Sequence, residues 1–98
     1  DQAKLTLAQA QLNLRTMKSA LDLAKSEAER YKKLLEQKFI SKSQYESSEK
    51  KLTEAQAAYE TADGVVESAR LSLESTEKNL QQLAEDIADQ KESLEKLR

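Results

Sequence analysis

The chain has 98 residues, 35% of them charged, a net charge of −2 at pH 7, one Gly, and no Pro, His or Cys. Without His and Cys it lacks the commonest general base, thiol nucleophiles, disulfides and the usual zinc ligands. We therefore predict that it is not an enzyme and that it has no catalytic residue, cofactor site or metal site. Ala, Leu, Glu, Lys and Gln dominate the composition, which is typical of long helices that bury a stripe rather than a globular core.

The first predicted element is a long helix over about residues 1–39. Its apolar residues recur in alternating steps of three and four, which is the heptad pattern of a coiled-coil seam. No apolar run approaches the roughly 20 residues of a membrane span. We interpret the start at Asp1, rather than at Met, as the mark of an excised segment or a processed product. The seam residues of this first arm are Ala3, Leu7, Ala10, Leu14, Met17, Leu21, Ala24, Ala28, Tyr31 and Leu35.

A turn at about residues 40–42 is predicted from the start signals of a second helix. Ser41 followed by Gln44 has the spacing of a capping box, in which each side chain bonds the backbone amide of the other residue. In that register Ile40 and Tyr45 occupy the two positions of a hydrophobic staple, which sets the angle at which the chain enters the helix. A second apolar series, starting at Tyr45, does not share the heptad frame of the first. The helix is therefore interrupted between the two series.

The second predicted helix covers about residues 43–98. A competing cap, Ser43 with Glu46, would move its start by two residues. The heptad stays in phase across Gly64, so we expect one continuous helix there, at a cost of ~1 kcal/mol relative to Ala. The seam residues of this second arm, with three polar interruptions, are Tyr45, Ser48, Leu52, Ala55, Tyr59, Ala62, Val66, Ala69, Leu73, Thr76, Leu80, Leu83, Ile87, Gln90, Leu94 and Leu97.

These elements predict an all-α fold, a two-helix antiparallel coiled-coil hairpin that forms a single domain over residues 1–98. The first arm is shorter than the second, so the end of the second arm has no partner in this chain. We expect this uncovered stripe to make the isolated segment self-associate, whereas residues preceding Asp1 would cover it in a complete parent protein. The stripe consists of Leu80, Leu83, Ile87, Leu94 and Leu97.

The expected tip, residues 30–46, carries Arg30, Leu34 and Ser41 at a characteristic spacing. In this stretch the chain resembles the hairpin tip of periplasmic adaptor proteins, also called membrane fusion proteins, which serve tripartite efflux pumps and type I secretion systems. The Arg, Leu and Ser signature of that family falls on these three residues. Lys38 stands where the family often has Gly, and Gln44 where an acidic residue is common.

The resemblance implies a non-catalytic periplasmic adaptor, anchored to the inner membrane through the rest of its parent chain. Its tip would dock end-on to an outer-membrane channel of the TolC kind through Arg30, Leu34 and Ser41, and the parent chain would reach an inner-membrane transporter. Neighbouring hairpins of the same protein would pack side by side around a conduit. The alternative function is a purely structural coiled-coil spacer or dimerisation rod.

Each tip residue also has a structural explanation. Ser41 caps a helix whatever the function, Leu34 can broaden the buried stripe, and Arg30 can pair with Glu27 on a solvated surface. Residues 30–51 contain seven Lys or Arg and three Glu, a net charge of +4, which suits steering toward an acidic partner. We do not expect nucleic acid as a partner, because no aromatic residues interleave these charges and the whole chain is acidic.

Overall fold

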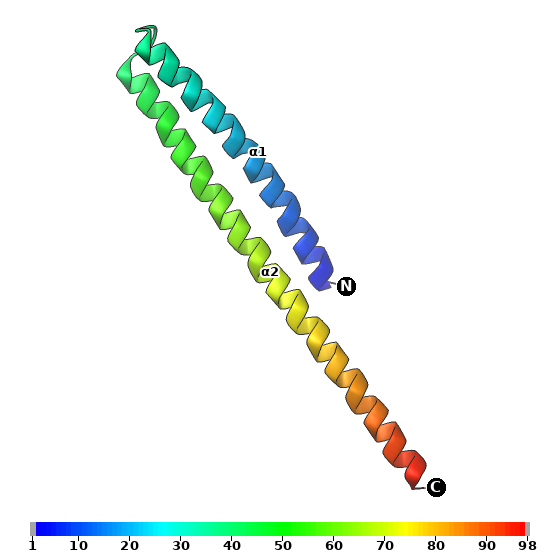
Figure 1. Cartoon of the computed structure of the whole chain (residues 1–98). Helices are drawn as coiled ribbons and strands as arrows, with labels where there is room; N and C mark the ends of the chain where they lie inside the picture. The colour runs from blue at the N-terminus through cyan, green and yellow to red at the C-terminus, as the bar shows by residue number, and fades with distance from the viewer. Residues whose placement is uncertain (1, 98) are drawn as a thin grey trace.

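The computed structural model describes residues 2–97, which form two antiparallel helices joined by a short turn (Figure 1). Helix α1 comprises Gln2–Glu36 and helix α2 comprises Lys42–Lys96, with 35 and 55 residues respectively. The molecule is a rod that is 90 Å long and 15 Å by 14 Å across. The all-α, two-helix antiparallel hairpin predicted from the sequence is therefore confirmed.

The turn differs in detail from the prediction. Helix α1 ends at Glu36 rather than near residue 39, and residues 37–41 connect the helices instead of residues 40–42. Helix α2 begins at Lys42, within one residue of the expected start. The earlier end of α1 follows from the backbone of Lys38, whose φ of 63° lies in the left-handed region and cannot continue a right-handed helix.

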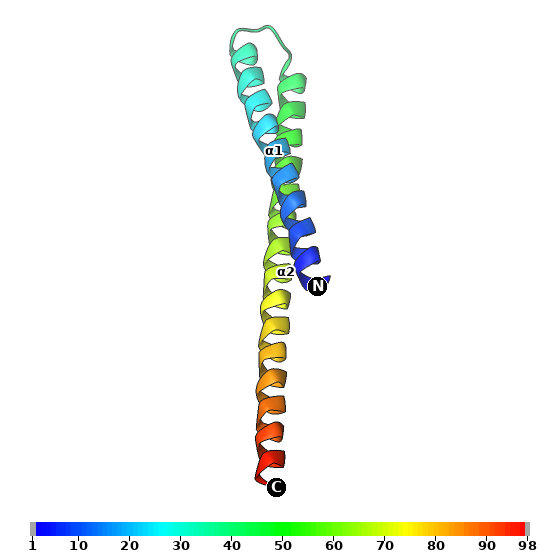
Figure 2. The same cartoon turned by 90° about the vertical axis from the view of Figure 1, so that its right-hand side faces the viewer.

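The contact between the helices follows the predicted seam. Every seam position within residues 3–35 and 45–76 is buried or partly buried, whereas the positions between them are mostly exposed. In Figure 2 the two helices cross one another along their length, as the helices of a coiled coil do. Small seam residues let the two backbones approach while larger ones fill the space beside them. A buried cluster of this kind, with two leucines packed against it, consists of Ala10, Val66, Ala69, Leu7 and Leu14.

One polar residue, Ser48, occupies the seam near the turn and is only 4% exposed. Its hydroxyl donates a hydrogen bond of 2.6 Å to the carbonyl oxygen of Tyr45, one turn earlier in α2. An unpaired buried hydroxyl would cost about 1–3 kcal/mol, and this bond avoids that cost. Ser48 therefore interrupts the apolar seam without interrupting the helix.

Helix α2 continues through Gly64 without a break. A Cβ atom placed on Gly64 would meet no neighbouring heavy atom within 4 Å. Packing within the chain therefore does not require Gly at this position, although Gly weakens the interior of a helix.

The last part of α2 extends beyond the start of α1 (Figure 1). All residues from 77 to 97 are exposed, and the uncovered stripe is between 55% and 83% exposed. Its members are Leu80, Leu83, Ile87, Leu94 and Leu97. Within the described residues, neither helix carries an apolar stretch sufficient to traverse a bilayer.

Candidate docking site at the hairpin tip

A Schellman motif, a pair of backbone hydrogen bonds that often ends a helix, closes the turn at the end of α1. The amide of Phe39 donates to the carbonyl oxygen of Leu34 at 2.9 Å, and the amide of Lys38 donates to that of Leu35 at 3.0 Å. Lys38 adopts the left-handed conformation that the motif requires. It thus occupies the place where the motif favours Gly.

On the other side of the turn, Ser41 is the N-cap of α2 and has an extended backbone, with φ −80° and ψ 158°. Its Oγ accepts a hydrogen bond of 3.2 Å from the amide of Gln44, and Oε1 of Gln44 accepts one of 2.9 Å from the amide of Ser41. Both bonds of the capping box are present, so the helix starts from Ser41 and not from Ser43. Ile40 and Tyr45, at the two staple positions, are partly buried.

Arg30 and Leu34 lie one turn apart on the same face of α1, because they are four residues apart. Arg30 is exposed, and its guanidinium lies over the ring of the neighbouring Tyr31, 5.4 Å from the ring centroid. Arg30 takes part in none of the ion pairs found among residues 2–97, so the alternative pairing with Glu27 does not form. Leu34 is partly buried. Of the three predicted docking residues, Arg30 and Leu34 therefore lie on one face of α1. The Ser41 hydroxyl is instead bonded within the turn, where it accepts from the amide of Gln44.

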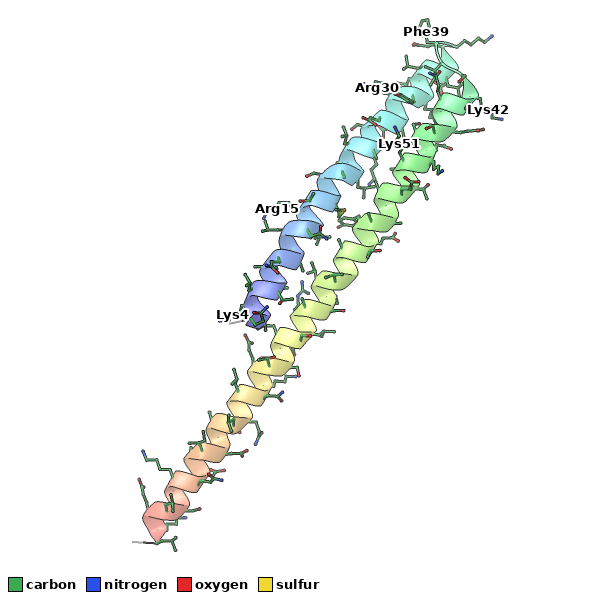
Figure 3. The ribbon with its side chains drawn as sticks, turned by 180° about the vertical axis from the view of Figure 1, so that it is seen from behind. Lys4, Arg15, Arg30, Phe39, Lys42 and Lys51 are labelled. Carbon is green, nitrogen blue, oxygen red and sulfur yellow. The ribbon has the colours of Figure 1, made fainter. Side chains whose placement is uncertain are left out.

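Phe39 was not among the residues predicted for the tip site. It is 73% exposed and lies at the apex of the hairpin (Figure 3). Its position follows from the Schellman motif, in which the residue after the left-handed position leaves the helix axis. The signal in the sequence was the position of Lys38, where Gly was expected, since a left-handed residue there turns the chain away from the helix just before Phe39.

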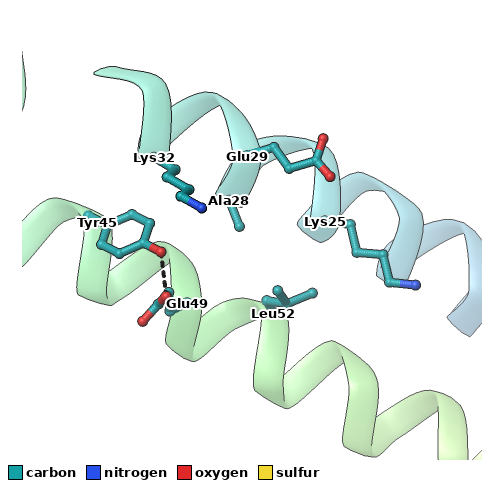
Figure 4. A pocket seen from close by; sticks show the side chains of 7 residues that line it. All are labelled: Lys25, Ala28, Glu29, Lys32, Tyr45, Glu49 and Leu52. Atoms are coloured by element: carbon teal, nitrogen blue, oxygen red, sulfur yellow. Dashed lines mark hydrogen bonds between the residues drawn. The ribbon is translucent and has the colours of Figure 1, made fainter. Parts of the chain in front are cut away.

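A shallow pocket opens between the helices near the tip (Figure 4). The hydroxyl of Tyr45 donates a hydrogen bond to Glu49. This bond, with desolvation and the negative charges of Glu49 and Glu36, raises the pKa of Tyr45 above its usual value of 10.0. Within residues 2–97, no group of three or more His, Cys, Asp or Glu is placed to hold a metal ion. The pocket is lined by Lys25, Ala28, Glu29, Lys32, Tyr45, Glu49 and Leu52.

The protein is an elongated helical hairpin with two long helices and a hydrogen-bonded turn at one end of the rod. Arg30 and Phe39 are exposed beside this turn. The sequence model described as the RND MFP, alpha-helical hairpin domain matches residues 2–76. The chain belongs to this family, the helical hairpins of the membrane fusion proteins of RND-type pumps. Members of the family are non-catalytic periplasmic adaptors anchored in the inner membrane. No individual curated protein matches the chain.

Proposed function

We propose that the tip of this hairpin docks end-on to the periplasmic mouth of a TolC-type outer-membrane channel. The rest of the parent protein would reach an inner-membrane RND transporter, so that the hairpin bridges the two for efflux. The observation that carries this proposal is the family match over residues 2–76, combined with a tip held by hydrogen bonds on both sides of the turn. Because the matching family is that of RND pumps, efflux is favoured over type I secretion.

The tip residues have separate roles in this proposal. Arg30 stacks on Tyr31 with one face, which leaves its N–H donors available for acceptors on the channel. Leu34, one turn away on the same face, fills an apolar groove of the partner. Ser41 acts through the turn, because its hydroxyl already bonds Gln44. The exposed ring of Phe39 is an additional apolar contact at the apex.

The charge of the tip supports an acidic docking partner. Residues 30–51 have a net charge of +4, whereas the whole chain has a net charge of −2. Lys42 and Lys51 lie at the same end of the rod as Arg30 (Figure 3). Positive charge gathered at one end orients the rod during encounter and raises the association rate with an acidic surface.

Substitution of the tip residues in the parent protein tests the proposal. We expect Arg30→Ala, Leu34→Ala and Ser41→Ala each to reduce efflux and to reduce crosslinking to the channel, while far-UV circular dichroism shows nearly unchanged helicity. Arg15→Ala is a matched control, because Arg15 is an exposed arginine on the shaft of α1, away from the tip (Figure 3). Leu35→Ala is the matched control for Leu34 and should act through stability, since Leu35 is a seam residue.

The alternative function, a structural rod, makes the opposite prediction for the same variants. A spacer or dimerisation rod needs the seam and the turn, but it does not need the exposed guanidinium of Arg30 or the side chain of Leu34, which lies beside the seam. Wild-type efflux and channel crosslinking in both variants would therefore favour the rod over the docking tip.

We also infer that the isolated chain self-associates through the uncovered stripe of α2. Burying one Leu or Ile side chain contributes about 1.5–3 kcal/mol before ordering costs. Two copies laid antiparallel along this stripe would form a twofold contact with Gln90 near its centre, where a polar seam residue favours one register.

A further inference from the structure

Tyr31 is a seam residue of α1 that also contacts a charged neighbour outside the seam. The guanidinium of Arg30 lies over its ring, with Cζ of Arg30 5.4 Å from the ring centroid. None of the ion pairs between residues 2 and 97 includes Arg30. Within this part of the chain, an aromatic ring rather than a carboxylate therefore holds the cation of Arg30.

The contact between Arg30 and Tyr31 is not a general consequence of helix geometry. Consecutive residues of an α-helix point about 100° apart, so adjacent side chains do not face each other. The two groups meet because the long side chain of Arg30 folds over a ring that belongs to the seam. An exposed arginine without such a support loses rotamer freedom when it binds a partner, and this ordering opposes binding. A ring that already holds the guanidinium lowers that cost.

A small residue of the facing helix leaves room for the Tyr31 ring. Ala10 and Ala69 belong to one buried cluster. Counting along the antiparallel helices from this pair places Tyr31 level with Ser48. Ser48 is only 4% exposed although its side chain is small, and its hydroxyl turns back to the carbonyl oxygen of Tyr45 on its own helix. A large seam residue at this level of α1 must therefore cover Ser48, and Tyr31 is that residue.

The ring of Tyr31 can hold Arg30 without blocking its hydrogen bonds. Cation–π attraction comes from the face of the ring and not from the phenol oxygen. The N–H donors of a guanidinium lie in its plane, so its edges stay available while one face is stacked. Stacking on Tyr31 is therefore compatible with hydrogen bonding from Arg30 to a partner.

We propose that Tyr31 is a positioning residue of the docking tip, whose ring holds the Arg30 guanidinium in the orientation that binds the channel. This inference rests on the docking function proposed above and gives Tyr31 a part in it. Tyr31 acts through Arg30 and does not itself contact the partner. Loss of the ring face is expected to weaken binding of the parent protein to the channel by about two- to fivefold, the contribution of an exposed cation–π contact.

NMR of the chain alone tests the orientation without any partner. The face of an aromatic ring shifts the resonances of nearby protons upfield, so the Nε–H and Cδ–H protons of Arg30 report whether the guanidinium stays over the ring. Tyr31→Leu is expected to remove this shift, and Tyr31→Phe, which keeps the ring face, is expected to retain it. All chains carry Ile87→Asp so that they stay monomeric. Identical Arg30 resonances in Tyr31→Leu and in the chain with Tyr31 would overturn the proposal.

A double-mutant cycle separates positioning of Arg30 from packing in the seam. Binding of the parent protein to the purified channel is measured for Tyr31→Leu, Arg30→Ala and the double variant. Because Tyr31 acts through Arg30, Tyr31→Leu is expected to weaken binding when Arg30 is present and to have no further effect in Arg30→Ala. A role confined to the seam would weaken binding equally in both backgrounds, and that result would overturn the proposal.

Two further variants serve as controls in the same binding assay. Tyr31→Phe is expected to bind the channel as the wild type does, and a loss as large as that of Tyr31→Leu would contradict a role for the ring face. Tyr59→Leu removes another partly buried seam tyrosine, which lies in α2 away from the tip. If Tyr59→Leu weakens binding as much as Tyr31→Leu, the effect comes from the seam and the proposal is wrong.

Failure of the docking function and failure of the positioning role give different results. If Arg30→Ala binds the channel as tightly as the wild type, Arg30 does not dock, whatever the NMR spectra show. If Arg30→Ala binds weakly while Tyr31→Leu leaves both the Arg30 resonances and the binding unchanged, Arg30 docks without help from Tyr31. The first result refutes the function proposed for Arg30, and the second refutes only the positioning role.

Discussion

Replacing Lys38 by Gly is expected to stabilise the hairpin by about 1 kcal/mol relative to replacing it by Ala. The φ of Lys38 is 63°, at the left-handed position of the Schellman motif. In this conformation the Cβ atom lies too close to the following carbonyl oxygen. Ala is the reference because it keeps Cβ but removes the Lys charge, which by itself interacts favourably with the C-terminal end of α1.

The magnitude comes from two opposing contributions. Removing Cβ from a left-handed residue relieves roughly 1–2 kcal/mol of strain in the folded state. The greater freedom of Gly in the unfolded chain offsets roughly 0.5–1 kcal/mol of this gain. The remaining difference of about 1 kcal/mol corresponds to a rise of about 4–8 °C in Tm for a chain of this length.

Urea unfolding followed by far-UV circular dichroism measures this difference, with all variants at one concentration. Gln37→Gly is the matched control, because Gln37 is adjacent but does not have a positive φ, so Gly there should lower stability. If Lys38→Gly is no more stable than Lys38→Ala, the left-handed backbone does not limit the stability of the turn. That result would refute the reasoning.

Three further predictions concern the rest of the hairpin. Ile87→Asp should abolish self-association of the isolated chain, measured by sedimentation equilibrium, without loss of helicity. A wild-type chain that stays monomeric at high concentration would show that the uncovered stripe of α2 does not mediate self-association. Ser41→Ala should lower the free energy of unfolding by about 0.5–2 kcal/mol through loss of the N-cap, whereas Ser47→Ala, inside α2, should not lower it. Because the pKa of Tyr45 is raised by its hydrogen bond to Glu49, the folded state holds the phenol proton more tightly than the unfolded state. That contribution to stability is present below pH 10.0 and is lost as pH rises through the folded pKa. Urea unfolding at a series of pH values above 10.0 should show that the wild type loses this contribution to its free energy of unfolding and that Tyr45→Phe does not. An identical pH profile for both chains would count against a stabilising hydrogen bond between Tyr45 and Glu49.

The two arms and their contact could be predicted because each arm keeps one heptad frame over its whole length. Small residues such as Ala10 and Ala69 occupy heptad seam positions, as the leucines do, and both are buried. The capping box could also be predicted, since Ser41 and Gln44 interact locally at a spacing that the sequence displays. The exposed end of α2 followed from unequal arm lengths alone.

The sequence did not predict that α1 ends at Glu36, because the residue whose left-handed backbone stops the helix is Lys38. Lys is a good helix former, and no Gly, Asn or Pro marks the position. The exposure of Phe39 depends on that same backbone conformation and was therefore missed as well. The stacking of Arg30 on Tyr31 depends on the rotamers of two adjacent side chains, which sequence spacing does not determine.

The bonded turn has a consequence for the kinetics of recognition. Fixing the backbone of one residue costs about 1–2 kcal/mol of conformational entropy. In this hairpin the amides of Gln37, Lys38, Phe39 and Ser41 are already hydrogen-bonded within the turn. A partner that binds the tip therefore meets a preorganised loop and has mainly side chains to order. Substitution of the uncharged, exposed Phe39 should accordingly change the lifetime of the bound complex far more than it alters the rate of encounter.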